Sequence, residues 1–171
     1  VLTSGKSEIT LKGKDVDLYP RLQEMATENP LVIETKLLKS IITETAFAAS
    51  LQESRPILTG VHFILENQKL LAVATDSHRL SQRVIPTEQA VEDFNIVIPG
   101  KSLTELSRSL TNEEEMVEIS IMENQVLFKT ETMYFYSRLL EGNYPDTNRL
   151  IPTSHNTQIE FYVPELLSAI E

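Results

Sequence analysis

An internal repeat constrains the fold of this chain more than any other feature. Two stretches, "ILENQKLLAVATDSHR" from Ile64 and "IMENQVLFKTETMYFY" from Ile121, match at a constant offset of 57 residues. They share Glu-Asn-Gln, a leucine and a threonine, Thr75 in one and Thr132 in the other. Apolar residues alternate on both sides of Glu-Asn-Gln, which is the pattern of two antiparallel strands joined by a tight turn. The repeat therefore predicts two β-hairpins.

Each predicted hairpin is preceded by a short run of apolar residues and then by residues with helical spacing. The segments are "LVIETKLLKSIITETAFAAS" and "IVIPGKSLTELSRSL", with Thr35, Pro99 and Lys101 where caps and first turns belong. Apolar residues recur near 3.6 spacing at Leu37, Leu38, Ile41, Ile42 and Ala48, and again at Leu103, Leu106 and Leu110. Each half therefore reads strand, helix, strands. This order predicts an α+β fold with helices on one face and antiparallel sheets on the other.

A second sequence similarity, at a longer offset, indicates that this unit is itself repeated. "DVDLYPRL" around Tyr19 resembles "EGNYPDTNRL" around Tyr144, and a strand-helix opening follows each. We interpret residues 1–27 as the end of one domain, 28–150 as a complete domain and 151–171 as the start of a third. Chance similarity between generic segments is the alternative. Tandem copies would extend the helical face along an arc.

Composition excludes several classes of function. The chain has no cysteine, and its three histidines lie far apart, so we expect no metal site and no cofactor. No apolar run approaches the roughly 20 residues that span a bilayer, and we expect a cytoplasmic protein. The motifs GxGxxG, GxxxxGK[ST], HExxH and GxSxG are absent. We therefore expect no enzymatic activity.

Asp76, Ser77 and His78 stand side by side as though they formed a hydrolase triad. Adjacent residues cannot converge as nucleophile, base and orienting group. Thr75-Asp76-Ser77 is instead turn-forming, so the next residues would be presented just past a strand end. With Leu58 and the segment "YPDTNRLIP", they could form an apolar cleft rimmed by guanidinium groups, suited to a short hydrophobic peptide. The alternative is that Leu80 and Leu150 are core and the arginines pair with local acids.

The net charge of −10, from 15 Lys+Arg and 25 Asp+Glu, argues against DNA binding, but the distribution of charge matters more than the sum. The solvent faces of the two predicted helices carry Lys36, Lys39, Lys101 and Arg108, whereas acidic residues gather in "TNEEEMVE" and "EQAVED". Such a cationic row can neutralise phosphates without reading bases. Ordinary solvated helix residues would give the same pattern.

Together these motifs resemble a known family. "SRPILTGVHFILENQKLLAVATDSHRL", "IVIPGKSLTELSRSL" and "LLEGNYPDTNRLIP" are similar to the central domain of bacterial β sliding clamps, the processivity subunits of replicative DNA polymerases. The resemblance implies a three-domain protomer that forms a head-to-tail homodimeric ring around double-stranded DNA. It also implies that polymerase, clamp loader and repair proteins dock through a Gln-Leu-x-Leu-Phe-like motif, and that the clamp itself is no catalyst.

The resemblance also assigns residues. It implies that part of the docking pocket is formed by residues beyond Glu171. The pocket residues that it assigns within this chain are Leu58, Thr75, Ser77, His78, Arg79, Leu80, Pro145, Arg149 and Leu150. It places Lys36, Lys39, Lys101 and Arg108 toward the DNA, with Arg55 near the rim of the hole. Three hypotheses remain at this stage: a DNA-encircling scaffold, a peptide-docking module without DNA contact, and an enzyme with an unrecognised motif.

Overall fold

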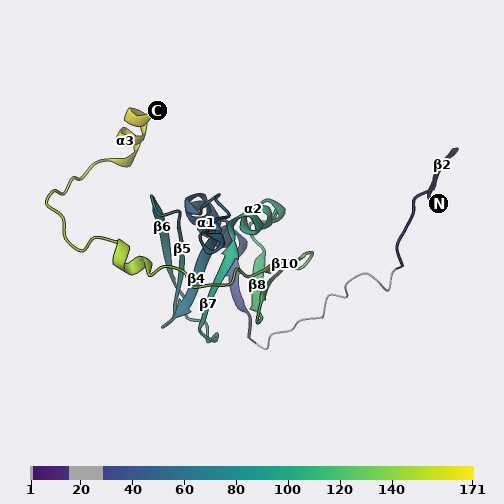
Figure 1. Ribbon diagram of the computed structural model, residues 1–171, viewed down its shortest axis with the longest axis horizontal. Coiled ribbons are helices and arrows are strands. Elements are labelled where there is room, and N and C mark those ends of the chain that lie inside the picture. Colours follow the sequence, from purple (N-terminus) through teal and green to yellow (C-terminus); the bar gives the residue numbers. More distant parts are fainter. Residues whose placement is uncertain (1, 16–28) are drawn as a thin grey trace.

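The computed structural model describes residues 2–15 and 29–171 (Figure 1). A short exposed hairpin, β1 (Leu2–Ser4) and β2 (Ser7–Ile9), lies apart from the body of the molecule. The Tyr19 echo and the predicted domain end at residue 27 fall outside the described residues. The body consists of two four-stranded antiparallel sheets and two helices, which confirms the predicted α+β architecture.

The two sheets have matching orders. One runs β6-β5-β4-β7 and the other β10-β9-β8-β3. Their bounds are β3 (Leu31–Glu34), β4 (Gly60–Glu66), β5 (Lys69–Thr75), β6 (Leu80–Pro86), β7 (Phe94–Pro99), β8 (Met116–Ile121), β9 (Gln125–Lys129) and β10 (Tyr134–Arg138). The pairs β4–β5 and β8–β9 are the two hairpins that the sequence repeat predicts.

The repeated Glu-Asn-Gln does not form the same turn twice. In the first hairpin the turn residues are Asn67 and Gln68, with φ of 51° and 59°, as a two-residue hairpin turn of the primed type requires. In the second hairpin the Met122 amide donates to the Gln125 carbonyl at 2.9 Å, so the turn lies one position earlier in the repeat. Similar sequence therefore fixes the hairpin but not its exact register.

Helices α1 (Thr35–Thr45) and α2 (Gly100–Ser109) lie side by side against the sheets (Figure 1). Their apolar stripes are fully buried at Leu38, Ile41, Leu103 and Leu106, which confirms the predicted helical faces. Thr35 is the first helical residue, and its buried hydroxyl has no hydrogen-bond partner among the described residues, so it lies in the first turn and does not cap the helix. The shorter helices are η2 (Ala46–Ala48), η3 (Pro56–Thr59), η4 (Thr147–Leu150) and α3 (Val163–Ile170).

Each half of the domain gives its first strand to the sheet of the other half. β3 pairs with β8, with Leu31 opposite Ile119, and β7 pairs with β4, with Ile98 opposite Val61. All four residues belong to one continuous core. Because each sheet is completed by a strand from the other half, the two halves depend on each other for folding.

A segment after β10, residues 139–150, crosses the outer face of the β6-β5-β4-β7 sheet, and we call it the strap (Figure 1). The Leu140 amide donates to the Val97 carbonyl at 2.8 Å, and the Thr75 amide donates to the Tyr144 hydroxyl at 3.1 Å. Beneath the strap, Val73 and Val97 are buried although they lie on the sheet face opposite the helices. The strap thus covers a second, smaller apolar layer.

Candidate functional site

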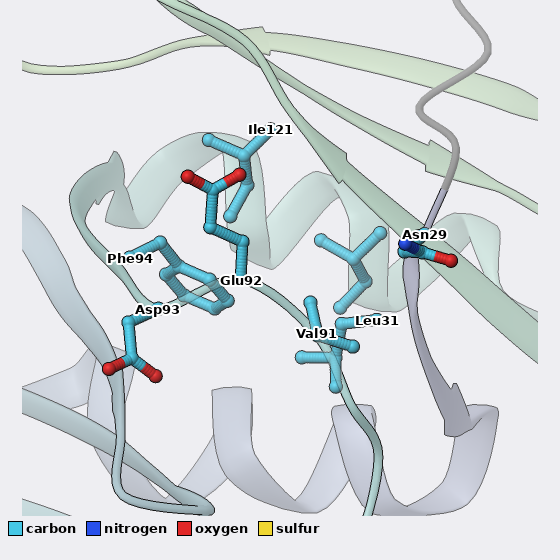
Figure 2. Close-up of a pocket in the computed structure, with 8 residues that line it drawn as sticks. Asn29, Leu31, Val91, Glu92, Asp93, Phe94 and Ile121 are labelled. Carbon is cyan, nitrogen blue, oxygen red and sulfur yellow. The ribbon is translucent and has the colours of Figure 1, made fainter.

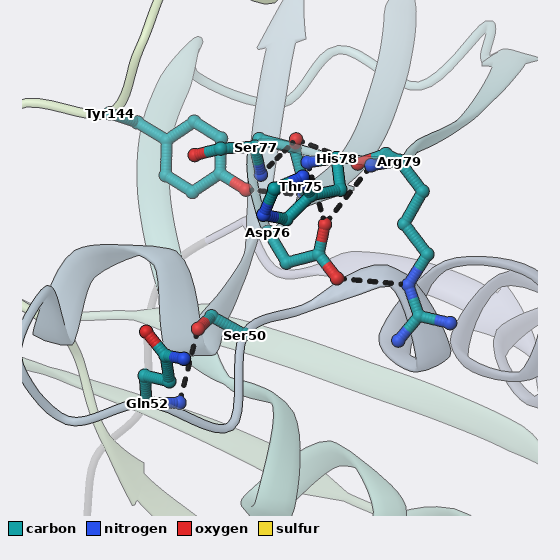
Figure 3. Close-up of polar contacts among 8 residues, drawn as sticks. All are labelled: Ser50, Gln52, Thr75, Asp76, Ser77, His78, Arg79 and Tyr144. Carbon is teal, nitrogen blue, oxygen red and sulfur yellow. Dashed lines mark hydrogen bonds and ion pairs between the residues drawn. The ribbon is translucent and has the colours of Figure 1, made fainter.

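The turn between β5 and β6, residues 75–80, is held together by two short side chains (Figure 3). We call it the docking turn, after the peptide docking that the sequence predicts there. Asp76 Oδ1 accepts from the backbone amides of His78 at 2.9 Å and Arg79 at 3.0 Å. Asp76 Oδ2 accepts from Arg79 Nε at 3.0 Å. Thr75 Oγ1 accepts from the Ser77 amide at 3.1 Å and donates to the Arg79 carbonyl at 2.7 Å. Ser77 takes a left-handed conformation, with φ of 80°.

This geometry explains why the Asp-Ser-His run is not a catalytic triad. The Asp76 carboxylate contacts the backbone of His78 and not its imidazole ring, so it orients no base. The two amide hydrogen bonds, followed by the charge and side-chain hydrogen bond of Arg79, hold the pKa of Asp76 below its ordinary value. The carboxylate therefore has a structural role: it closes the turn.

Replacing Asp76 by alanine is expected to loosen the docking turn, because the amides of His78 and Arg79 lose their acceptor. Amide hydrogen exchange at these two residues should become faster, while Asp93→Ala, at an exposed aspartate outside the docking turn, should leave it unchanged. Since the folded pKa of Asp76 is lowered, its contribution is complete above the ordinary pKa of about 3.9. The contribution is lost only as the pH falls through the lower folded value. Unchanged exchange in Asp76→Ala would contradict this role.

The docking turn is flanked by groups from the chain before β4. Arg55 Nη1 donates to Ser77 Oγ at 2.9 Å, so Arg55 lies against the docking turn. The guanidinium carbon of Arg79 lies 5.7 Å from the centre of the Phe47 ring, a cation–π distance. A hollow of about 210 Å³ opens here, lined by Ala49, Ser50, Leu51, Gln52, Arg55, Asp76, His78 and Arg79. Phe47 and Leu51 are 58% and 89% exposed, and sequence reasoning did not single them out.

The other predicted pocket residues are divided between the buried layer and the surface. Leu58 and Thr75 are buried, Leu80 is half-buried, and Pro145 and Leu150 are exposed on the strap. Leu80 and Leu150 are thus not core residues. The arginines, in contrast, pair with nearby acidic residues, as the alternative interpretation of the sequence expected. Arg79 pairs with Asp76 at 3.0 Å, and Arg149 pairs with Asp146 at 2.9 Å.

Tyr144 joins the two parts of the predicted pocket. Its hydroxyl accepts from the Thr75 amide at the end of β5, and Pro145 follows it directly on the strap. Within the described residues, no hydrogen bond or ion pair links Arg149 or Leu150 to the docking turn. The repeated Tyr-Pro in the sequence drew attention to Tyr144. The repeat did not predict that Tyr144 contacts Thr75.

The two long helices present basic residues of different kinds. Lys36 and Lys101 are exposed, and neither has an ion-pair partner among the described residues. Lys39 Nζ donates to the Leu110 carbonyl at 3.2 Å and lies 3.4 Å from Glu113 Oε1, so it ties α1 to the end of α2. Arg108 pairs with Glu105 at 2.9 Å. Within residues 2–15 and 29–171, Lys36 and Lys101 are therefore the basic residues of these two helices that no acidic side chain neutralises.

A hollow of about 460 Å³ lies at the opposite end of the strands (Figure 2). Its apolar lining comes from Leu31, Val91, Phe94, Ile119 and Ile121, with Asn29, Glu92 and Asp93 completing it. Figure 2 shows the carboxylates of Glu92 and Asp93 on either side of the Phe94 ring. This negative rim disfavours an anionic ligand such as DNA.

Across residues 2–15 and 29–171, no group of three or more His, Cys, Asp or Glu side chains is arranged to hold a metal ion. Within the same residues, no helix has the length and apolar character needed to cross a bilayer.

Comparison with known proteins identifies the family. Residues 32–146 match the family model described as DNA polymerase III beta subunit, central domain. The chain belongs to the DNA polymerase III beta subunit family. It is 62% identical to the beta sliding clamp of Streptococcus pneumoniae over the whole of this chain and 46% of that protein. The chain thus spans about half the length of the curated beta subunits that it matches.

Solved beta-subunit structures have the same fold. The DNA polymerase beta subunit of Streptococcus pyogenes is 61% identical, with a TM-score of 0.87 over 98% of this chain and 46% of that one. The DNA polymerase sliding clamp of Bacillus subtilis is 48% identical, with a TM-score of 0.89 over 98% of this chain and 44% of that one. The family resemblance inferred from the sequence is therefore confirmed.

Proposed function

We propose that this chain is the central part of a sliding clamp, a processivity factor that encircles double-stranded DNA and tethers the replicative polymerase. The match of residues 32–146 to the family model carries this proposal. The clamp acts in the cytoplasm as an accessory subunit and catalyses no reaction. Tethering raises the effective concentration of polymerase at its template, so a dissociation event no longer ends synthesis.

The domain organisation inferred from the sequence forms part of this proposal: the middle domain spans 28–150 and a third domain begins at 151. The exposure of apolar side chains after residue 150 supports it. They include Ile159, Phe161, Tyr162, Val163, Leu166, Leu167 and Ile170, on or just before α3. A helix with this much exposed apolar surface needs a partner to cover it. In the whole protein, that partner is the remainder of the third domain.

DNA would contact the face formed by α1 and α2. Lys36 and Lys101 are exposed there and form no ion pair with any residue that the structure describes, and cations of this kind bind phosphates without reading sequence. Lys39 and Arg108 lie on the same helices but are partly neutralised by Glu113 and Glu105. A head-to-tail homodimer would close this face around the duplex.

Polymerase, clamp loader and repair proteins would dock at the opposite side of the sheet through short linear motifs. The docking surface combines the docking turn with the strap, which the Thr75–Tyr144 hydrogen bond joins. The half-buried Leu80 and the exposed Leu150 supply apolar contacts, and Arg79 and Arg149 supply charge at the rim. Residues beyond 171 would complete the pocket wall.

Threading can be tested by retention of the whole protein, loaded onto DNA by its clamp loader. We expect it to stay on circular DNA and to leave linear DNA through the ends, because a closed ring can only slide off. A double substitution Lys36→Ala/Lys101→Ala should weaken the salt-sensitive contact, whereas Lys69→Ala at the exposed β4–β5 turn is the matched control.

Equal retention on both DNA forms would contradict threading. The chain would then be a peptide-docking module without DNA contact, an alternative that its net charge of −10 favours.

A further inference from the structure

His62 lies in β4 beneath the strap, with only 7% of its surface exposed. Its Nε2 is 2.6 Å from Asn95 Oδ1. Because an amide oxygen can only accept, Nε2 carries the proton and donates. The other ring nitrogen, Nδ1, is buried and has no hydrogen-bond partner in the part of the chain that the structure describes. This arrangement fits a neutral imidazole, since a second proton on Nδ1 would find no acceptor.

The His62 ring supports Tyr144. The two ring centres are 4.6 Å apart, and the planes are tilted by 37°. The Tyr144 hydroxyl in turn accepts from the Thr75 amide, at the start of the docking turn. Contacts therefore run from the imidazole through Tyr144 to Thr75, and Tyr144 also fixes the strap just before Pro145.

We propose that His62 is a positioning residue for the docking surface, and that peptide docking is coupled to its protonation state. In its neutral form the His62 ring packs against Tyr144. Tyr144 in turn keeps the strap at a fixed distance from the docking turn. Protonation places a buried charge under Tyr144, releases the strap and weakens docking. The inference rests on the docking function proposed above.

Among the described residues, those that strand pairing, a hydrogen bond or a ring contact places against His62 are all uncharged. Its cross-strand neighbours are Val73 on β5 and Val97 on β7, and Asn95 on β7 is neutral. The Tyr144 ring that contacts His62 is itself titratable, and burial raises the pKa of Tyr144, which keeps it uncharged. Burial likewise lowers the pKa of His62, against a smaller opposing effect of the Asn95 hydrogen bond.

The sign of the pH effect follows from this lowered pKa. With the strap closed, His62 binds a proton less readily than it does when water reaches it. The closed state is therefore fully favoured above the ordinary histidine pKa of about 6.5. Its advantage falls as the pH drops below that value, and it levels off below the pKa of the closed state. Because one proton is involved, the affinity can fall by at most roughly tenfold per pH unit.

The first test measures binding of a fluorescent Gln-Leu-x-Leu-Phe-like peptide to the whole protein between pH 8 and pH 5. Wild-type affinity should be constant above about pH 6.5 and fall below it. His62→Gln, which cannot titrate, should give a flat profile. His155→Gln, which removes an exposed histidine outside the docking turn and the strap, is the matched control and should keep the wild-type fall.

A second test needs no variant, so it holds even if His62→Gln folds poorly. The pKa of His62 is followed by NMR with and without saturating peptide. Because coupling is reciprocal, a peptide that prefers neutral His62 must lower that pKa further. An unchanged pKa, or a pH-dependent fall that persists in His62→Gln, would overturn the inference while leaving docking intact. If no peptide binds at pH 8, the docking function itself fails.

Discussion

Replacing Phe128 by alanine is expected to lower the free energy of unfolding by about 3–5 kcal/mol, the usual cost of such a truncation in a core. Phe128 is 1% exposed on β9, opposite Ile119 on β8 and Phe135 on β10. Its ring meets that of Phe135 edge-on, with centres 6.4 Å apart. Truncation removes the buried ring and leaves a cavity between the sheet and the helices, which the close-packed core cannot fill without strain.

Such a loss is large against a total stability of about 5–15 kcal/mol for a domain. Urea unfolding followed by circular dichroism would measure it. Phe47→Ala makes the same change at a side chain that is 58% exposed, and it should cost far less. If Phe128→Ala does not fold, Phe128→Leu should still show an intermediate loss, because most of the volume remains. Equal losses at Phe128 and Phe47 would contradict the assignment of the core.

The sequence was sufficient for features that depend on local periodicity. The 3.6-residue spacing of Leu38, Ile41, Leu103 and Leu106 predicted two buried helical stripes, and all four residues are fully buried. The alternation around Glu-Asn-Gln predicted both hairpins. These patterns predict structure well because a helix or a hairpin is formed by residues close together in the chain.

The exchange of first strands could not be predicted in this way. β3 resembles a generic apolar strand, and nothing in "LVIE" specifies that Leu31 pairs with Ile119 rather than with the hairpin that follows it. The choice depends on long-range packing around a shared core. The one-residue shift between the two turns has a similar origin, because the register follows which side chains must face the core.

The candidate site could be predicted only in part, because it too depends on contacts between residues that are distant in the chain. Turn chemistry at Asp76 indicated a presented segment, and Asp76 indeed closes the docking turn. The contacts of Arg79 with Phe47 and of Tyr144 with Thr75 join residues that are distant in the chain. No local pattern encodes such contacts. The assignment of Arg149 and Leu150 to the docking pocket remains a prediction.

Peptide docking at the docking turn can be tested at Leu80 and Arg79, the two residues expected to matter most. Leu80→Ala is expected to weaken binding of a Gln-Leu-x-Leu-Phe-like peptide to the whole protein by about 30-fold or more, the scale of an interface hot spot of about 2 kcal/mol. Leu80 is half-buried at the first position of β6, where the docking turn ends, so its side chain can be covered by a ligand. Isothermal titration calorimetry at pH 8 would measure the change.

Arg79→Ala should also weaken binding, for a different reason. Its guanidinium group both pairs with Asp76 and lies over Phe47, so its removal loosens the docking turn and removes charge at the rim. Arg79→Lys keeps the charge but loses the Nε contact with Asp76, and its affinity should fall between those of the wild type and Arg79→Ala. Lys101→Ala, on the helical face, is the control and should bind the peptide normally. Wild-type affinity in all four variants would remove the docking turn from the site, because a surface that binds the peptide there cannot lose Leu80, or the guanidinium group of Arg79, without a measurable cost.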